Sequence, residues 1–376
     1  MTVVEILEAL VAIPTPSSVS NVPLIDWVVD FLSQHGWQAD IHSYNDEQGT
    51  AKANLIARPR SAEKDVPIGL AFVCHTDTVP YASAWTGALR LNEHTKTGTL
   101  HGCGSCDVKG ALACFLAAID RLNPARVQPD CALILTADEE IGCRGMERLL
   151  ESDSLKIGSA IVSEPTELHP GVAGKGYGLA RVTVRGAEAH SAFPEKGVPA
   201  IQHAAHFIQA LEERMKRTEI SDALFTPPRT TFNVGVIEGG TAKNIVPGIC
   251  SFLVEWRPIP SEHPHNAVGV LEAIAGELEA REPRLKIQVE ALRGDAGFAP
   301  AGEGALQQRL RALLPADRTP VGISFGSEAS RLARVAGEVI VIGPGDMQTA
   351  HSERECVPIA ELEAWTSTLC ALFARS

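Results

Sequence analysis

Residues Leu133–Gly145 read LILTADEEIGCRG and join an apolar run to three consecutive acids. The run Cys131–Leu135 predicts a buried β-strand, and Asp138, Glu139 and Glu140 follow it. Three ionised carboxylates at one strand end destabilise one another unless a cation, usually a metal ion, holds them. Successive side chains on extended backbone point in opposite directions, so one glutamate can bind metal while the other acts on water. The plain alternative is a solvated acidic turn.

The bulk composition favours a soluble globular protein over a nucleic-acid or membrane protein. A chain of 376 residues fits about two domains of ~100–200 residues each. Its 46 acidic and 33 basic residues give a net charge of −13, which repels nucleic acid and favours a small-molecule substrate. No apolar run reaches the ~20 residues of a membrane span. The first ten residues carry Glu5 and Glu8 where a signal peptide would carry basic residues, so we expect a cytoplasmic protein.

The nine cysteines are an odd number and lie mostly inside apolar runs, which is typical of reduced, buried thiols. Cys103 and Cys106 form a C-x-x-C pair without a second pair elsewhere. Such a lone pair is weak evidence for a zinc knuckle or a redox centre, and plain packing is the favoured interpretation.

Apolar periodicity predicts an α/β fold in the first half of the chain. Expected helices cover Thr2–Ala12, Pro23–His35 and Lys109–Leu122. Expected strands cover Trp37–Ser43, Ala53–Ala57, Val66–Cys74, Cys131–Leu135 and Ser159–Val162. Polar clusters follow several of these strands directly, at the sheet edge where open α/β sheets bind ligands.

The pattern changes near residue 174 to the order β-α-β-β-α-β of a ferredoxin-like module. Its expected elements are Leu179–Arg185, Gly197–Lys216, Thr230–Ile237, Ile249–Trp256, Pro264–Ala280 and Leu285–Leu292. Further expected elements follow at Ala305–Leu314, Glu338–Ile342 and Pro358–Ala374. We therefore predict a discontinuous catalytic domain, residues 1–173 and 294–376, with a mainly parallel sheet flanked by helices, and an inserted α+β lid and dimerisation domain at 174–293.

Four further segments present acids or histidines beside expected strand ends or loops. His75 and Asp77 suit a metal ligand with an orienting carboxylate behind it, although such pairs also occur without metal. Asp107 precedes a helix, where an N-cap is the alternative. Glu164 and His351 could each be ordinary loop residues. Together with the acidic run they supply two histidines and three carboxylates, a donor set that suits a pair of zinc ions.

Seven motifs in order resemble a known family of zinc-dependent amidohydrolases. They are HTDTVP (75–80), GCGSCDVKG (102–110), TADEEIG (136–142), SEPT (163–166), GAEAHSAFP (186–194), AKNIVP (242–247) and AHSERE (350–355). The family includes acetylornithine deacetylase, succinyl-diaminopimelate desuccinylase, aminoacylases and bacterial glutamate carboxypeptidases. The resemblance runs essentially from end to end of the chain.

The resemblance implies a role for each matching residue. Metal ligands for two zinc ions, or for cobalt, would be His75, Asp107, Glu140, Glu164 and His351, with Asp107 bridging. Asp77 would orient His75, and Glu139 would be the general base. His190 would reach from the lid domain of one subunit into the site of its partner in a homodimer. Substrate-binding positions would be Asn244, Arg257, Gly326, Ser327 and Glu328.

Within the family, GSCDVKGALA and FGSEA most resemble acetylornithine deacetylase, which implies release of ornithine and acetate in arginine biosynthesis. Alternatives are hydrolysis of succinyl-diaminopimelate, acetylcitrulline or acetyl-lysine, or a di- or aminopeptidase. A non-catalytic, metal-stabilised dimeric binding protein is a remote alternative, because Glu139 and every ligand are present. Cys103 and Val108 depart from the usual arginine and methionine beside Asp107, and neither replaces a ligand.

Overall fold

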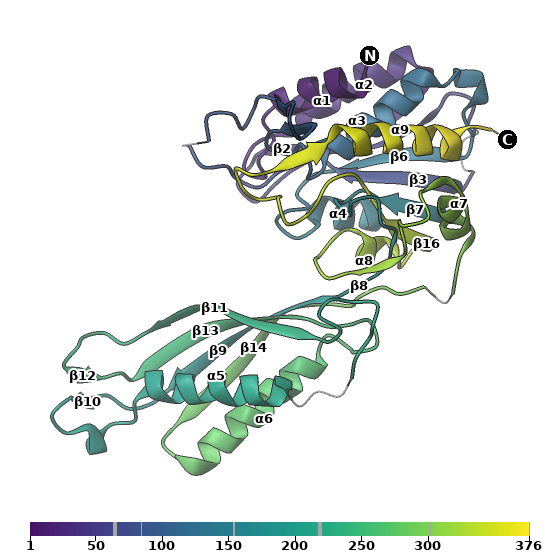
Figure 1. The fold of residues 1–376 in the computed structure, drawn as a ribbon. Coiled ribbons are helices and arrows are strands. Elements are labelled where there is room, and N and C mark those ends of the chain that lie inside the picture. The colour runs from purple at the N-terminus through teal and green to yellow at the C-terminus, as the bar shows by residue number, and fades with distance from the viewer. Residues whose placement is uncertain (63–65, 84, 153–154, 217–219, 301, 376) are drawn as a thin grey trace. The chain divides into compact units, whose positions relative to one another are not determined.

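The computed structural model describes residues 1–62, 66–83, 85–152, 155–216, 220–300 and 302–375 (Figure 1). The chain forms two compact units. Unit 1 comprises Met1–Val172, Pro300–Val321 and Ser327–Ser376, and unit 2 comprises Ala173–Ala299 and Gly322–Gly326. The short return of the chain through unit 2 at Gly322–Gly326 was not part of the predicted insert. Within the described ranges, no helix is both long and apolar enough to cross a membrane.

An eight-stranded sheet has the order β1-β2-β6-β3-β7-β16-β8-β15, and its residues belong to unit 1 except at the ends of β8 and β15. The strands are β1 Trp37–Asn45, β2 Ala51–Pro59, β3 Ile68–His75, β6 Cys131–Thr136, β7 Ile157–Val162, β8 Gly171–Gly174, β15 Val321–Ile323 and β16 Ala336–Val341. The central strands β6, β3, β7 and β16 run parallel, while β1, β2 and β8 pair antiparallel with their neighbours. This sheet and its helices confirm the predicted fold class.

Helices flank this sheet on both faces (Figure 1). They are α1 Val3–Ala12, α2 Val22–Gln34, α3 Lys109–Arg121, α4 Arg144–Ser152, α7 Ala305–Leu313, α8 Ala329–Leu332 and α9 Ile359–Phe373, with a 3-10 helix at Pro124–Arg126. In Figure 1, α1, α3 and α9 lie together on one face, and α4 and α8 lie on the other. The residues of α3 from Lys109 to Ile119 are all buried, so α3 is the central helix of its layer.

Helix α1 illustrates how the local sequence determines where a helix begins and which of its faces is buried. Thr2 and Glu5 form a capping box, in which the Thr2 side chain accepts from the Glu5 amide and the Glu5 carboxylate accepts from the Thr2 amide. Val3, Ile6 and Leu10 are buried on one side of the helix, as the helical period requires.

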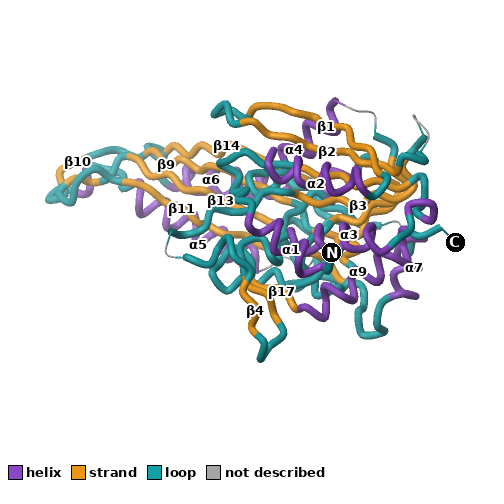
Figure 2. Tube along the Cα trace, turned by 90° about the horizontal axis from the view of Figure 1, so that it is seen from above, coloured by secondary structure: helices purple, strands orange, loops and turns teal. Residues whose placement is uncertain are grey.

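A small three-stranded sheet stands apart from the main sheet and is ordered β17-β5-β4 (Figure 2). Its strands are β4 Asn92–His94, β5 Thr99–His101 and β17 Cys356–Pro358. Because β5 pairs with β17, this sheet brings the loop before Asp107 to the C-terminal segment that contains Glu355.

Unit 2 has the predicted β-α-β-β-α-β element order and an antiparallel sheet ordered β11-β13-β9-β14. Its elements are β9 Tyr177–Arg185, α5 Ala200–Lys216, β11 Thr231–Gly239, β13 Ile249–Arg257, α6 Asn266–Arg281 and β14 Lys286–Asp295. A separate two-stranded ladder pairs β10 Ala189–His190 with β12 Ile245–Val246, and a 3-10 helix lies at Pro194–Lys196. The buried faces of α5, α6 and the sheet share one apolar core.

Candidate metal centre

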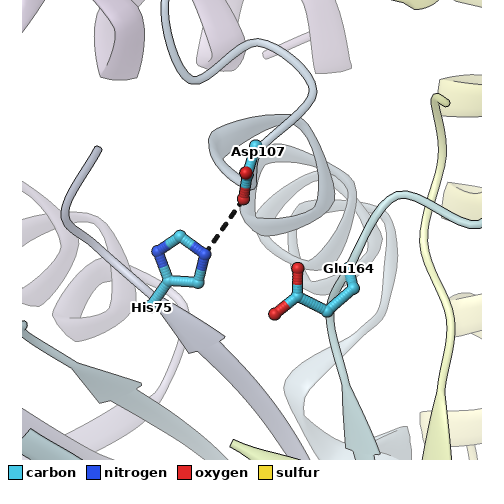
Figure 3. Close-up of side chains that lie close together, drawn as sticks. All are labelled: His75, Asp107 and Glu164. Carbon is cyan, nitrogen blue, oxygen red and sulfur yellow. Dashed lines mark hydrogen bonds and ion pairs between the residues drawn. The ribbon is translucent and has the colours of Figure 1, made fainter. Parts of the chain in front are cut away.

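His75 is the last residue of strand β3, and its imidazole points towards Asp107 (Figure 3). Its Nε2 lies 3.1 Å from Asp107 Oδ1, and its Nδ1 lies 2.9 Å from the main-chain carbonyl oxygen of Asp77. Hydrogen bonding to that carbonyl places the Nδ1 proton and leaves Nε2 as the nitrogen that can bind a metal.

Asp107 has one carboxylate oxygen facing each of two histidines. Oδ1 lies 3.1 Å from His75 Nε2, and Oδ2 lies 3.1 Å from His351 Nε2. The N-cap alternative is not what the structure contains, because the N-cap of α3 is Val108 and it has no side-chain capping bond. A buried carboxylate between two imidazoles has the placement that a bridging ligand requires.

Glu164 follows strand β7 and turns its carboxylate into the space beside His75 and Asp107 (Figure 3). His75, Asp107 and Glu164 offer donor atoms that all lie within 4.8 Å of one another, and all three residues are buried. Gly343 lies on a neighbouring segment of the same chain. A Cβ atom at this position would be 2.7 Å from the Glu164 carbonyl oxygen. A glycine is therefore needed there for the two segments to approach closely.

A second group of donors comprises Asp107, Glu140 and His351, again within 4.8 Å of one another. His351 Nε2 lies 3.2 Å from the Glu140 carboxylate. The two groups share Asp107, so the five residues expected from the sequence lie together in unit 1 as two adjoining sites.

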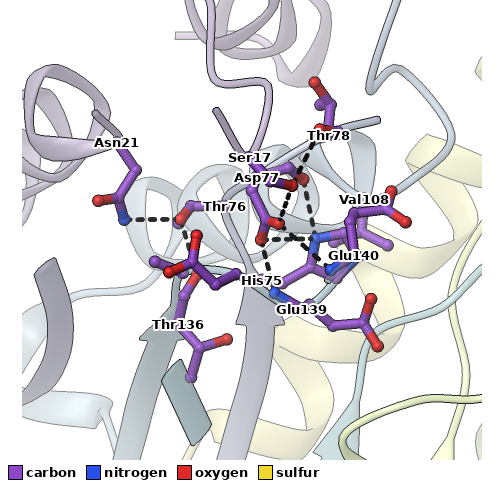
Figure 4. A network of polar contacts seen from close by, with 12 residues as sticks. Ser17, Asn21, His75, Thr76, Asp77, Thr78, Val108, Thr136, Glu139 and Glu140 are labelled. Atoms are coloured by element: carbon purple, nitrogen blue, oxygen red, sulfur yellow. Dashed lines mark hydrogen bonds and ion pairs between the residues drawn. The ribbon is translucent and has the colours of Figure 1, made fainter. Parts of the chain in front are cut away.

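The contact between Asp77 and His75 is made by the main chain of Asp77 and not by its carboxylate. Its carboxylate lies 3.7 Å from His75 Nδ1, too far for a normal hydrogen bond. The carboxylate instead accepts the backbone N–H groups of Glu139 at 3.0 Å and Glu140 at 3.2 Å, and the Ser17 hydroxyl at 2.7 Å (Figure 4). Asp77 therefore orients His75 through its carbonyl and fixes the glutamate turn through its side chain.

Glu139 belongs to neither donor group among the described residues, whereas its neighbour Glu140 belongs to one. The Cys143 thiol donates to Glu139 Oε1 at 3.3 Å. Burial, more than the nearby carboxylates, raises the pKa of Glu139 to about 8. A carboxylate with a pKa near neutrality is suited to exchange a proton with a reacting group.

The electrostatics of the site fit a cation. Burial raises the pKa of Glu164 well above its usual range, and burial also raises the pKa of Glu140. Burial lowers the pKa of His75, but the Asp107 hydrogen bond and nearby carboxylates outweigh it and hold the pKa well above the usual range. Hydrogen bonds that His351 donates to the Asp107 and Glu140 carboxylates raise the pKa of His351 to about 10. His75, His351, Glu140 and Glu164 thus hold protons more tightly than usual without metal, and metal ions would compete with these protons.

Three of the five residues expected to bind substrate, Asn244, Arg257 and Gly326, lie in unit 2, as does His190. His190 is exposed on β10, and its backbone partner across the two-stranded ladder is Ile245, next to Asn244. The Arg257 guanidinium stacks 4.6 Å above the Tyr177 ring, while its Nε donates to Glu255 at 3.0 Å. Gly326 lies beside Arg257, whose Nη1 would be 3.4 Å from a Cβ at that glycine.

The other two expected substrate residues, Ser327 and Glu328, lie in unit 1 and are buried. Glu328 is only 1% exposed. Burial raises the pKa of Glu328 to about 7, although the Thr136 side chain and the charge of His75 act in the opposite direction. Glu328 is thus an interior carboxylate close to the donor cluster, not a surface acid.

Sequence reasoning missed Glu355 as a contributor to this site. Glu355 Oε1 accepts the backbone N–H groups of Cys106 and Asp107, each at 3.1 Å. The carboxylate therefore holds the loop that presents Asp107. The available signal was its place at the end of the AHSERE motif (350–355).

Comparison with known proteins identifies the family to which the chain belongs. The family model described as "Peptidase family M20/M25/M40" matches residues 71–375. The chain belongs to this peptidase family. Membership in peptidase family M20/M25/M40 confirms the predicted class of enzyme, a metal-dependent amidohydrolase.

Relatives of this M20/M25/M40 protein cover nearly its whole length. It is 42% identical over 373 residues to an acetylornithine deacetylase from Myxococcus xanthus, covering 98% of this chain and 96% of the relative. It is 29% identical to an acetylornithine deacetylase from Proteus mirabilis (strain HI4320), covering 96% and 93%. Its fold resembles that of a tripeptidase from Staphylococcus aureus subsp. aureus Mu50, with a TM-score of 0.79, 20% identity, and coverage of 99% and 96%.

Metal removal should make stability fall with rising pH. The pKa of Glu139 is raised from 4.5 to about 8 in the folded protein. Such a group contributes stability below its unfolded pKa, and that contribution is lost as pH rises through the folded pKa. His351, with its pKa raised to about 10, acts in the same direction.

We therefore expect the Tm of chelator-treated protein to fall between about pH 6 and about pH 9, and the gain in Tm on adding zinc to grow over the same interval. Differential scanning fluorimetry of metal-free and zinc-reloaded samples measures both quantities. A metal-free Tm that rises across this interval contradicts the electrostatic account of the site.

Proposed function

We propose that this protein hydrolyses N-acetylornithine to ornithine and acetate, in arginine biosynthesis. The observation that carries the proposal is the pair of donor groups sharing Asp107, with Glu139 beside them and outside both. The resemblance to acetylornithine deacetylases over nearly the whole chain supports the choice of substrate.

Two zinc ions are the proposed cofactors, held by His75, Asp107 and Glu164 on one side and by Asp107, Glu140 and His351 on the other. Mixed imidazole and carboxylate donors suit zinc, and cobalt is the alternative. When bound, such ions supply a Lewis acid for the amide oxygen and lower the pKa of water towards neutrality.

Glu139 is the proposed general base and acid. Its carboxylate would take a proton from the attacking water and return that proton to the leaving amine nitrogen. The Asp77 carboxylate holds the Glu139 amide, and the Cys143 thiol contacts its Oε1. These contacts keep the base in place while it exchanges the proton.

Two residues are proposed to recognise the charged groups of the substrate. The Arg257 guanidinium suits the α-carboxylate, because arginine binds carboxylates in a fixed, two-pronged geometry. Glu328 suits the side-chain ammonium of ornithine, because a buried carboxylate is stabilised by a cation. Asn244, Gly326 and Ser327 are proposed to complete the substrate-binding positions.

A homodimer is proposed to bring His190 to the partner's metal centre, where it would stabilise negative charge on the amide oxygen. Strand β11 is an outer strand of the described four-stranded sheet, and its Val236 and Ile237 are 49% and 51% exposed. An exposed apolar edge strand is suited to pair with a second chain. Residues 174–293 would then serve as the lid and dimerisation domain.

The cytoplasm is the proposed location, because all nine cysteines are free and seven of them are buried. Free thiols in such number fit a reducing compartment. The substrate is a small molecule, and the net charge of −13 disfavours nucleic acid and anionic membrane surfaces as partners.

Separate substitutions of the two adjacent glutamates distinguish a role in metal binding from a role in proton transfer. Glu139→Gln should keep near-normal zinc content and lose turnover by orders of magnitude. Glu140→Ala should lose zinc as well, because Glu140 belongs to a donor group. Elemental analysis and kcat measure the two effects. Zinc loss in Glu139→Gln but not in Glu140→Ala would reverse the two assignments.

Substrate preference tests the proposed reaction. We expect kcat/KM for N-acetylornithine to exceed that for succinyl-diaminopimelate and for dipeptides by at least about tenfold, or ~1.4 kcal/mol. Glu328→Gln should reduce kcat/KM for N-acetylornithine while sparing N-acetylnorvaline, which lacks the side-chain ammonium. Zinc content of the variant is the control. A preference for either competitor would reject N-acetylornithine and leave the family assignment intact.

Subunit complementation tests the shared site. His190→Ala and Glu139→Gln are each expected to be nearly inactive. After the two variants are unfolded, mixed and refolded, half of the dimers are mixed, and each mixed dimer has one complete site of two if His190 serves the partner. About a quarter of wild-type activity should therefore return. Background activity with mixed dimers demonstrated by differential tags would place His190 in its own subunit's site.

A further inference from the structure

Lys52 is a fully buried cation that none of the proposed catalytic steps uses. It lies on β2 with a side chain that is 0% exposed, and its Nζ is 2.9 Å from Asp138 Oδ1. The same ammonium donates to the backbone carbonyls of Ser17 at 2.6 Å and Val19 at 2.8 Å. The three partners are one carboxylate oxygen and two backbone carbonyl oxygens. Through them Lys52 connects β2 with the 17–19 loop and with the turn after β6.

Asp138 is the first of the three consecutive acids, and its carboxylate contacts Lys52 and Tyr44. It belongs to neither donor group, and its Oδ2 accepts the Tyr44 hydroxyl at 2.9 Å. Its φ of 59° lies in the left-handed region, which is uncommon for a residue with a side chain. The Lys52 and Tyr44 contacts hold the backbone in this conformation, from which the chain enters Glu139 and Glu140.

A second route connects Lys52 to the same turn. Lys52 binds the Ser17 carbonyl, the Ser17 hydroxyl donates to Asp77, and the Asp77 carboxylate accepts the amides of Glu139 and Glu140. Figure 4 shows Ser17, Asp77 and the two glutamates in this arrangement. Lys52 is therefore connected to the turn that carries Glu139 and Glu140 by two routes, one through Asp138 and one through Ser17.

We propose that Lys52 is a positioning residue for the metal centre, acting through Asp138 and Ser17 to aim Glu140 at the metal and Glu139 at the reacting water. The inference rests on the proposed metal centre. A purely structural ion pair is the alternative, because removing one member of a buried pair destabilises a protein whatever its neighbours do. The two differ in whether metal affinity changes along with stability.

The test substitution is Lys52→Met, which keeps the length of the side chain and removes the ammonium. Changes to groups that orient metal ligands typically cost about 10–100-fold in metal affinity or activity. We expect zinc dissociation constants, measured by chelator competition, to rise by at least about tenfold. The gain in Tm on adding zinc should shrink, and kcat should fall more than KM rises.

Lys175→Met is the matched control. Lys175 is also buried, and its Nζ donates to two backbone carbonyls, those of Pro227 and Arg229, within unit 2. This variant should lose stability in the metal-free form and keep the zinc affinity of the wild type. Comparing the two variants thus separates the general effect of losing a buried ammonium group from the specific effect of losing the Lys52 ammonium group.

The double variant Lys52→Met/Asp138→Asn removes both charges and tolerates the left-handed backbone, since asparagine adopts it readily. It should recover much of the metal-free Tm, and it provides the measurement if Lys52→Met alone does not fold. Zinc affinity should stay weakened, because the Lys52 bonds to Ser17 and Val19 are still missing.

Zinc affinity equal to wild type in Lys52→Met, or fully restored in the double variant, would make Lys52 a structural residue only and overturn the inference. Wild-type protein is titrated first, with an expected stoichiometry of two zinc ions per chain. Absence of zinc binding by wild type would instead overturn the metal centre itself, so the two failures are distinguishable.

Discussion

Repulsion among carboxylates at one edge of the main sheet is the constraint around which unit 1 is arranged. The parallel strands β3, β6 and β7 end at this edge and are followed by His75, the Asp138–Glu140 run and Glu164. Charges brought so close in a buried site require compensation. The structure supplies it in three ways, with the imidazoles of His75 and His351, the backbone amides that Asp77 and Glu355 accept, and the ammonium of Lys52.

The sequence predicted the parts of this site that depend on strand ends and motifs. A polar residue directly after a buried strand lies at the sheet edge, so His75, Glu140 and Glu164 could be placed together before the structure was known. Element order alone predicted the module in unit 2. The five proposed ligands could be named because each lies in a short motif that resembles a motif of the family.

Contacts between distant segments could not be predicted in the same way. An aspartate two residues after a histidine suggests a side-chain pair, yet the Asp77 carboxylate binds the amides of Glu139 and Glu140, more than 60 residues away. Lys52 resembles an ordinary strand lysine, and only the fold reveals that it is buried beside Asp138. Two-residue strands such as β10 and β12 are too short to leave a periodic pattern.

The order of the ligands along the chain has a consequence for biosynthesis. One donor group needs His351, and the loop carrying Asp107 needs Glu355, both of which lie within the last 26 residues of this 376-residue sequence. The same terminal segment forms β17 and α9, which cover the loop and the central helix α3. A nascent chain still short of this segment has the acidic sheet edge without its second histidine. The second donor group is therefore incomplete until the segment that contains His351 has been synthesised and has folded onto unit 1.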